Sequence, residues 1–123
     1  MSARFTDRLE VDFDVDAAAR PCLVPTLVLQ PLVENAIKHN PPRADRPARV
    51  RVSAHVAADG DLVVAVEDNG PGLGAEGISM ARGVGLRNTQ SRLQTLYPGR
   101  TLEFVPSALG GLRVQLNLPS ETP

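Results

Sequence analysis

The chain has 123 residues, of which 42% are hydrophobic, and this length and composition are typical of one domain with a modest core. Its 13 basic and 14 acidic residues leave a net charge of -1, so no overall field favours nucleic acid or an anionic membrane. With three Phe, one Tyr and no Trp, the chain is also poor in side chains that stack on single-stranded nucleic acid. The single cysteine, Cys22, excludes an internal disulfide. Together with only two histidines it argues against a structural zinc site and favours a reducing, cytosolic setting.

The first part of the chain predicts a strand followed by a helix. Residues 9–15 alternate apolar and acidic side chains, which is typical of a strand with one wet face. Apolar residues at helical spacing follow, until prolines at 41–42 end the helix. Its start is open, because Pro31 inside a helix removes a hydrogen bond at a cost of about 3 kcal/mol. The helix therefore begins either near Pro25 or near Gln30. The longest apolar run, residues 22–33, is broken by prolines and polar residues, so the sequence predicts no membrane-spanning helix and no signal peptide.

Alternation, apolar runs and turn residues predict four strands and one helix in the remaining chain. In chain order these elements cover residues 50–56, 62–67, 86–97, 101–105 and 112–118, the third being the helix. Turns are expected at Asp59-Gly60 and Gly110-Gly111, and Pro98-Gly99 ends the helix.

The predicted order of elements is therefore β-α-β-β-α-β-β within a single domain, residues 1–123. Several strands have one polar face, and only two helices are available to cover the sheet. We therefore expect a two-layer α/β sandwich, in which both helices cover one face of a mixed, largely antiparallel sheet and leave the other face in water.

Polar side chains gather on one arc of the first helix, opposite its apolar stripe. They are Gln30, Glu34, Asn35, Lys38 and His39. A carboxylate, a carboxamide and an ammonium within three turns suit Mg²⁺ and the phosphates that it neutralises. Taken alone, the same pattern is more often that of an ordinary amphipathic surface helix.

Two glycine-rich segments follow the apolar run at 62–67. Asp68 can accept a hydrogen bond from an exocyclic amine such as that of adenine, and Gly70 and Gly72 let the backbone approach a flat ring. Taken alone, this segment is more often ordinary turn chemistry. Further along, the residues Gly83, Val84, Gly85 and Leu86 open the second predicted helix. Free N–H groups and the helix dipole make such a start a phosphate site.

In combination, these segments resemble the sensor histidine kinases. Residues 29–39 are similar to the N box, 68–72 to the G1 box and 83–88 to the G2 box. Two motifs most resemble the LytS-type subgroup: Leu-Gln-Pro-Leu-Val-Glu-Asn at 29–35 and Arg-Leu-Gln-Thr-Leu-Tyr at 92–97. The resemblance covers residues 5–118 and favours a continuous helix through Pro31.

The resemblance implies the Bergerat ATP-binding fold of the GHKL proteins, with MgATP between the first helix and the glycine loops. It implies that Asn35 ligates Mg²⁺, that Lys38 contacts phosphate and that Asp68 holds the adenine amine. Gly70 and Gly72 would shape the adenine pocket. The backbone of Gly83, Val84, Gly85 and Leu86 would wrap the phosphates.

Glu34 is the candidate catalytic residue, assisting proton removal or metal hydration. Its side chain points about 100° away from that of Asn35 around the helix. Residues 73–82 would form the ATP lid, although this segment is short and has no phenylalanine motif.

Neither histidine has the helical context of a phosphoacceptor, since His39 follows the N box and His55 lies on the polar face of a predicted strand. We therefore expect a monomeric catalytic domain that donates the γ-phosphoryl group of ATP to a histidine on a separate dimerisation domain. The resemblance implies a homodimeric parent kinase at the inner membrane and a response regulator of the LytTR type. This part of the kinase would be cytoplasmic and would contact neither nucleic acid nor the membrane.

Three alternatives share the same fold: a stand-alone anti-sigma-factor serine kinase, a gyrase-like ATPase, and a nucleotide-sensing module without transfer activity. The first two carry a carboxylate one turn before the metal-binding asparagine. This chain has Pro31 at that position, which argues against both.

Overall fold

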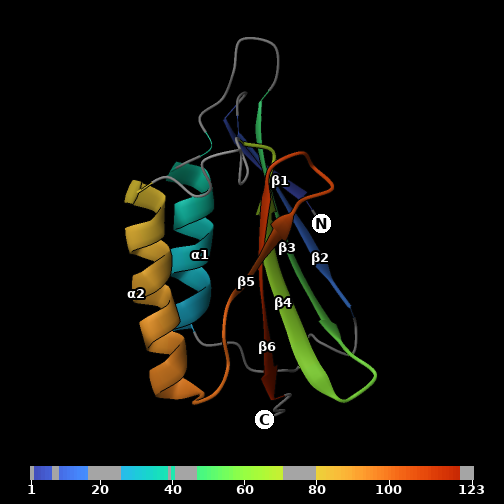
Figure 1. Ribbon diagram of the computed structural model, residues 1–123. Helices are drawn as coiled ribbons and strands as arrows, with labels where there is room; N and C mark the ends of the chain where they lie inside the picture. The colour runs from blue at the N-terminus through green and yellow to red at the C-terminus, as the bar shows by residue number, and fades with distance from the viewer. Residues whose placement is uncertain are drawn as a thin grey trace.

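The computed structural model describes residues 2–6, 9–16, 26–38, 40, 47–70 and 80–119, which form a six-stranded sheet and two helices (Figure 1). In chain order the elements are β1 (Ser2–Thr6), β2 (Leu9–Val15), α1 (Thr26–Lys38), β3 (Ala48–Val56), β4 (Asp61–Asp68), α2 (Met80–Leu96), β5 (Glu103–Pro106) and β6 (Leu112–Pro119). Within the described residues, no helix is long and apolar enough to cross a membrane.

The strands lie in the order β1-β2-β3-β4-β6-β5. Only β2 and β3 pair in parallel, because α1 connects them, and every other neighbouring pair is antiparallel. The prediction of a mixed, largely antiparallel sheet is confirmed.

Both helices lie on the same face of the sheet, as predicted (Figure 1). The core lies between the layers and consists mainly of valines and leucines that alternate along the central strands. Its fully buried large members include Val50, Leu62, Val64, Val66, Leu112, Leu116 and Leu118 from the sheet, and Leu93 from α2. The opposite face of the sheet carries polar and charged side chains, so the alternation in the sequence has its expected physical cause.

α1 is continuous through Pro31. Loss of one backbone hydrogen bond costs about 3 kcal/mol, whereas burying one large apolar side chain contributes about 1.5–3 kcal/mol. Leu32 and Ala36 are buried, and Leu29 and Val33 pack against the same core. The apolar stripe of the helix therefore outweighs the proline, and the start near Gln30 is wrong.

α2 begins at Met80, earlier than the predicted start at Gly83 to Leu86. Met, Ala and Arg at 80–82 are strong helix formers, and they extend the helix although each glycine costs about 1 kcal/mol. As a result, Gly85 and Leu86 lie in the second turn, where backbone N–H groups are bonded within the helix. The assignment of their backbone to the phosphates stays a prediction.

The edges of the sheet differ from the prediction in two places. β1 was not predicted, because Ser2–Thr6 shows no apolar alternation, and this strand is defined by antiparallel pairing with β2. β5 runs from Glu103 to Pro106 rather than over 101–105. Edge strands pair on one side only, so their sequences are less constrained than those of central strands.

Candidate functional site

Asp68 is the last residue of β4 and is fully buried, at 0% exposure. It continues the series Leu62, Val64 and Val66, so its side chain lies on the helix side of the sheet. Its Oδ1 accepts hydrogen bonds from the backbone N–H groups of Gly70, at 2.9 Å, and Leu112, at 3.3 Å. These bonds hold a carboxylate in a fixed direction at the end of a buried strand.

Two glycines pack against this carboxylate. A Cβ on Gly70 would lie 3.2 Å from the Asp68 Oδ1, and a Cβ on Gly111 would overlap Asp68 and lie 2.6 Å from the Gly70 nitrogen. The Gly111 N–H also donates to the Asp68 carbonyl, at 3.1 Å. The space around Asp68 therefore requires glycine at Gly111, and it leaves only a tight fit for a larger residue at Gly70. Gly70 was predicted, whereas Gly111 was predicted only as a turn residue.

A buried pair of amides, Asn40 and Asn69, lies next to Asp68. The Asn40 Nδ2 donates to the Asn69 Oδ1 at 2.9 Å, and the two residues are only 3% and 4% exposed. Neither was predicted as a site residue. The only sequence signals are their positions, directly after the N box and inside the Asp-Asn-Gly turn.

Asn35 of α1 faces Gly85 of α2, since a Cβ on Gly85 would lie 3.1 Å from the Asn35 Nδ2. Asn35 is half-buried, and among the described residues no donor forms a hydrogen bond to its buried Oδ1. Thr89, also buried, donates from Oγ1 to the Gly85 carbonyl at 3.0 Å. The close approach of the helices at Gly85 thus places a carboxamide from the N box against the G2 box.

Glu34 and Lys38 lie on the exposed side of α1. The Glu34 Oε1 accepts a hydrogen bond from the Gln30 Nε2, one turn earlier, at 2.9 Å. Its catalytic role stays a prediction. Lys38 ends the helix, where a flexible ammonium can reach an anion at this end of the molecule.

The other predicted residues lie in the core, in the first turns of α2, or outside the described residues. Leu86 belongs to the core, at 3% exposure. Gly83 and Val84 belong to the first two turns of α2. Gly72, His39 and the lid residues 73–79 lie outside the described residues. The structure brings Asp68 together with Gly70, and Asn35 together with Gly85. Both pairs lie toward the end of the two layers where β4 and α1 finish and α2 starts (Figure 1).

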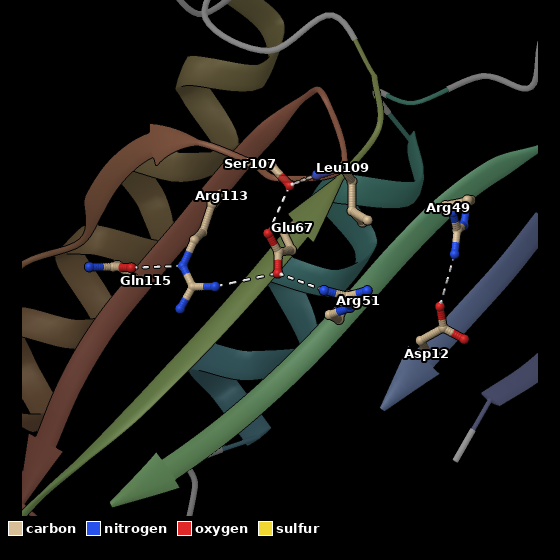
Figure 2. A network of polar contacts seen from close by, with 8 residues as sticks. All are labelled: Asp12, Arg49, Arg51, Glu67, Ser107, Leu109, Arg113 and Gln115. Atoms are coloured by element: carbon tan, nitrogen blue, oxygen red, sulfur yellow. Dashed lines mark hydrogen bonds and ion pairs between the residues drawn. The ribbon is translucent and has the colours of Figure 1, made fainter. Parts of the chain in front are cut away.

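The opposite face of the sheet has a separate polar network, centred on the buried Glu67 (Figure 2). The Glu67 Oε2 accepts from the Ser107 Oγ at 2.7 Å, while Oε1 lies 3.3 Å from the Arg113 Nη1 and 3.9 Å from the Arg51 Nη1. Because Glu67 and Asp68 are adjacent on a strand, their side chains point to opposite faces. This network is therefore part of the fold and not of the Asp68 site.

No group of three or more His, Cys, Asp or Glu side chains gathers anywhere in the described part of the chain.

Comparison with known proteins agrees with this geometry. The family described as histidine kinase-, DNA gyrase B-, and HSP90-like ATPase (HATPase_c) matches residues 24–122. The sensor histidine kinase YesM of Bacillus subtilis is 38% identical over 96 residues, covering 76% of this chain and 16% of YesM. The sensor protein LytS of Staphylococcus saprophyticus is 35% identical over 127 residues, covering 95% of this chain and 21% of LytS. The chain thus spans well under a quarter of the length of both relatives.

A solved structure shows the same fold. The catalytic domain of the histidine kinase ThkA is 17% identical and superposes over 94% of this chain and 82% of that domain, with a TM-score of 0.70. The two-layer arrangement of the sheet and helices is therefore the one found in the ATP-binding domains of histidine kinases. The chain belongs to the histidine kinase-, DNA gyrase B- and HSP90-like ATPase family, and its relatives are sensor histidine kinases.

Proposed function

We propose that this domain binds ATP with Mg²⁺ and donates the γ-phosphoryl group to a histidine on a separate dimerisation domain. The observation that carries the proposal is the fully buried Asp68 carboxylate, held by the Gly70 and Leu112 amides where β4 ends. A buried carboxylate at the end of a strand, with Gly70 and Gly111 packed against it, suits a planar base that bears an amine.

Adenine recognition is assigned to Asp68, Gly70 and Gly72. A carboxylate has about four acceptor positions, so Asp68 can accept an adenine amine in addition to the backbone N–H groups that hold it. Gly70 has no side chain between this carboxylate and Asn40. The ring can therefore approach the backbone closely.

Phosphate and metal contacts are assigned to the facing ends of the two helices. The Asn35 carboxamide oxygen is a hard ligand of the type Mg²⁺ takes, and its position against Gly85 fits this role. Lys38 supplies a positive charge for phosphate, and Gly83 and Val84 lie near the start of α2, where the helix dipole favours an anion. When bound, Mg²⁺ neutralises phosphate charge.

The phosphoacceptor is assigned to another part of the parent kinase. His55 is exposed on β3 and shares the open face of the sheet with Arg51 and Ser53, opposite the face that carries Asp68. It cannot take an in-line position for a nucleotide held by Asp68. The dimeric state of the parent kinase, its membrane anchoring and a response regulator of the LytTR type belong to the same proposal.

The test is incubation with γ-labelled ATP, followed by analysis of the label in acid and in base. We expect no efficient labelling of this chain alone. Adding the dimerisation domain of the parent kinase should give an acid-labile, base-stable phosphohistidine. Efficient labelling of the isolated chain would contradict the proposal, and acid-stable, base-labile labelling of an added partner would favour a serine kinase of the anti-sigma class.

A further inference from the structure

The Asn40–Asn69 pair is one of the most completely hydrogen-bonded polar groups of the described residues. The Asn69 Oδ1 accepts from the Asn40 Nδ2 and from the Arg49 N–H, both at 2.9 Å, and the Asn69 Nδ2 donates to the Pro47 carbonyl at 3.2 Å. The Asn40 Nδ2 also donates to the Arg49 carbonyl at 3.1 Å. Both side chains are buried, so the bond between them is shielded from competition with water.

These bonds join three parts of the chain at the end of the sheet that carries Asp68. Asn40 lies just after α1, Pro47 and Arg49 lie at the start of β3, and Asn69 directly follows β4. The Asn69 N–H donates to the Arg49 carbonyl at 3.2 Å, which continues the β3–β4 pairing one step past Asp68. The pair therefore sets the distance between the N box helix and the segment that begins with Asp68.

Asn40 also limits the position of Gly70. A Cβ on Gly70 would lie 2.9 Å from the Asn40 Oδ1, so the two groups are in contact without room for a methyl group. Gly70 in turn donates its N–H to the Asp68 Oδ1. A movement of Asn40 is thus transmitted through Gly70 to the carboxylate.

We propose that Asn40 and Asn69 are positioning residues that hold the Asp68 carboxylate in the direction needed to select adenine over bases without the amine. This inference rests on the proposed function. The Asn69 amide accepts two N–H groups on its oxygen and donates to a carbonyl from its nitrogen, so this side chain is matched to its surroundings.

The test compares ATP with inosine triphosphate, in which an oxo group replaces the adenine amine. Dissociation constants are measured for the wild type, Asn69→Ala and Asn40→Ala at a temperature where each is folded. The wild type should prefer ATP by about tenfold to 150-fold, the range for a hydrogen bond to a charged group. In both variants this preference should fall to about threefold or less, mainly through weaker binding of ATP.

Gln90→Ala is the matched control. It removes two hydrogen bonds between α2 and the segment before β5, to the Leu102 N–H and the Arg100 carbonyl, far from Asp68 in the chain. It should lower the unfolding temperature and leave the ATP preference at the wild-type value. A purely structural role for the Asn40–Asn69 pair would give the same pattern as this control.

An unchanged preference in a folded Asn69→Ala or Asn40→Ala variant overturns the inference. So does failure of both variants to fold, because the pair would then act on the fold alone. Asn40→Ala leaves in place the bonds of Asn69 with the Arg49 N–H and the Pro47 carbonyl, so this variant retains part of the network that supports the fold. Failure of the proposed function is a different result, namely a wild type that shows no preference for ATP.

Discussion

Gly111 shows how closely single residues are fitted around Asp68. A Cβ at this position would overlap the carboxylate, so Gly111→Ala must displace Asp68 or the loop after β5. We expect a loss of about 1–3 kcal/mol in the free energy of unfolding, as for other overpacked sites, together with weaker ATP binding. Urea denaturation and ATP titration of the same variant measure both effects.

Gly110→Ala is the neighbouring control. Gly110 has φ 105°, and a Cβ at this position would have nothing within 4 Å, so alanine is strained there without touching Asp68. The substitution should cost about 1–2 kcal/mol in stability and leave ATP affinity at the wild-type value. Equal effects of the two substitutions on ATP affinity would show that Gly111 acts through the loop and not on Asp68.

Single site residues could be predicted where the signal lies in residues that are neighbours in the sequence. Asp68 and Gly70 were predicted because they stand in a short contiguous segment that resembles the G1 box, whereas the same segment taken alone is more often an ordinary turn. Asn40 and Gly111 were not predicted as site residues, because their contacts are with residues distant in the sequence. Asn40 bonds to a residue 29 positions away, and the Asp68 carboxylate to a backbone amide 44 positions away. No short sequence pattern carries such pairings.

Among the elements, the packing of α1 on α2 at Gly85 allows a test of the proposed metal site. Gly85→Ala should not lower stability, because alanine favours a helix by about 1 kcal/mol over glycine. The new methyl group would lie 3.1 Å from the Asn35 Nδ2 and push that side chain aside. We therefore expect Mg²⁺ to strengthen ATP binding less in this variant than in the wild type.

Ser91→Ala, on the exposed face of α2, is the control for helix propensity. It should stabilise the domain slightly and leave the Mg²⁺ enhancement unchanged. ATP titrations with and without Mg²⁺, with thermal unfolding, separate the two effects. A full enhancement in Gly85→Ala would place the metal away from the contact between Asn35 and Gly85.

Element type was predictable, whereas element ends were less so. The apolar spacing of α1 and α2 and the alternation along β2, β3, β4 and β6 predict the right element at each place. Pro31 misleads at the start of α1 because packing against the core outweighs its local cost, and the glycines at 83 and 85 mislead at the start of α2 because the strong helix formers at 80–82 precede them.

For the whole molecule, the open face of the sheet is stabilised by charge pairing around Glu67. Glu67→Ala would leave Arg51 and Arg113 without their buried partner and the Ser107 hydroxyl without its acceptor. These arginines are 35% and 25% exposed, so water screens part of the effect. We expect a loss of about 1–3 kcal/mol in the free energy of unfolding, measured by urea denaturation.

ATP affinity of the folded Glu67→Ala variant should match the wild type, since Glu67 and Asp68 point to opposite faces. Glu103→Ala removes an exposed carboxylate that bonds to Gln115 and should change stability by less than about 0.5 kcal/mol. A large loss of ATP affinity in Glu67→Ala would mean that the two faces of β4 are coupled.

The two-layer architecture was predictable as a whole, because strands with one polar face and only two helices leave few other arrangements. β1 was missed because an edge strand with mixed side chains has no periodic signal. It is defined only by its pairing with β2.

The most direct measurement of the central claim is the affinity for ATP of the wild type and of Asp68→Ala, with the fold of each verified by circular dichroism. Asp14→Ala, an exposed carboxylate on β2, is the control. ATP should bind Asp68→Ala about tenfold to 150-fold more weakly than the wild type, since a hydrogen bond to a charged group is lost. Unchanged affinity in a folded Asp68→Ala variant would contradict the account.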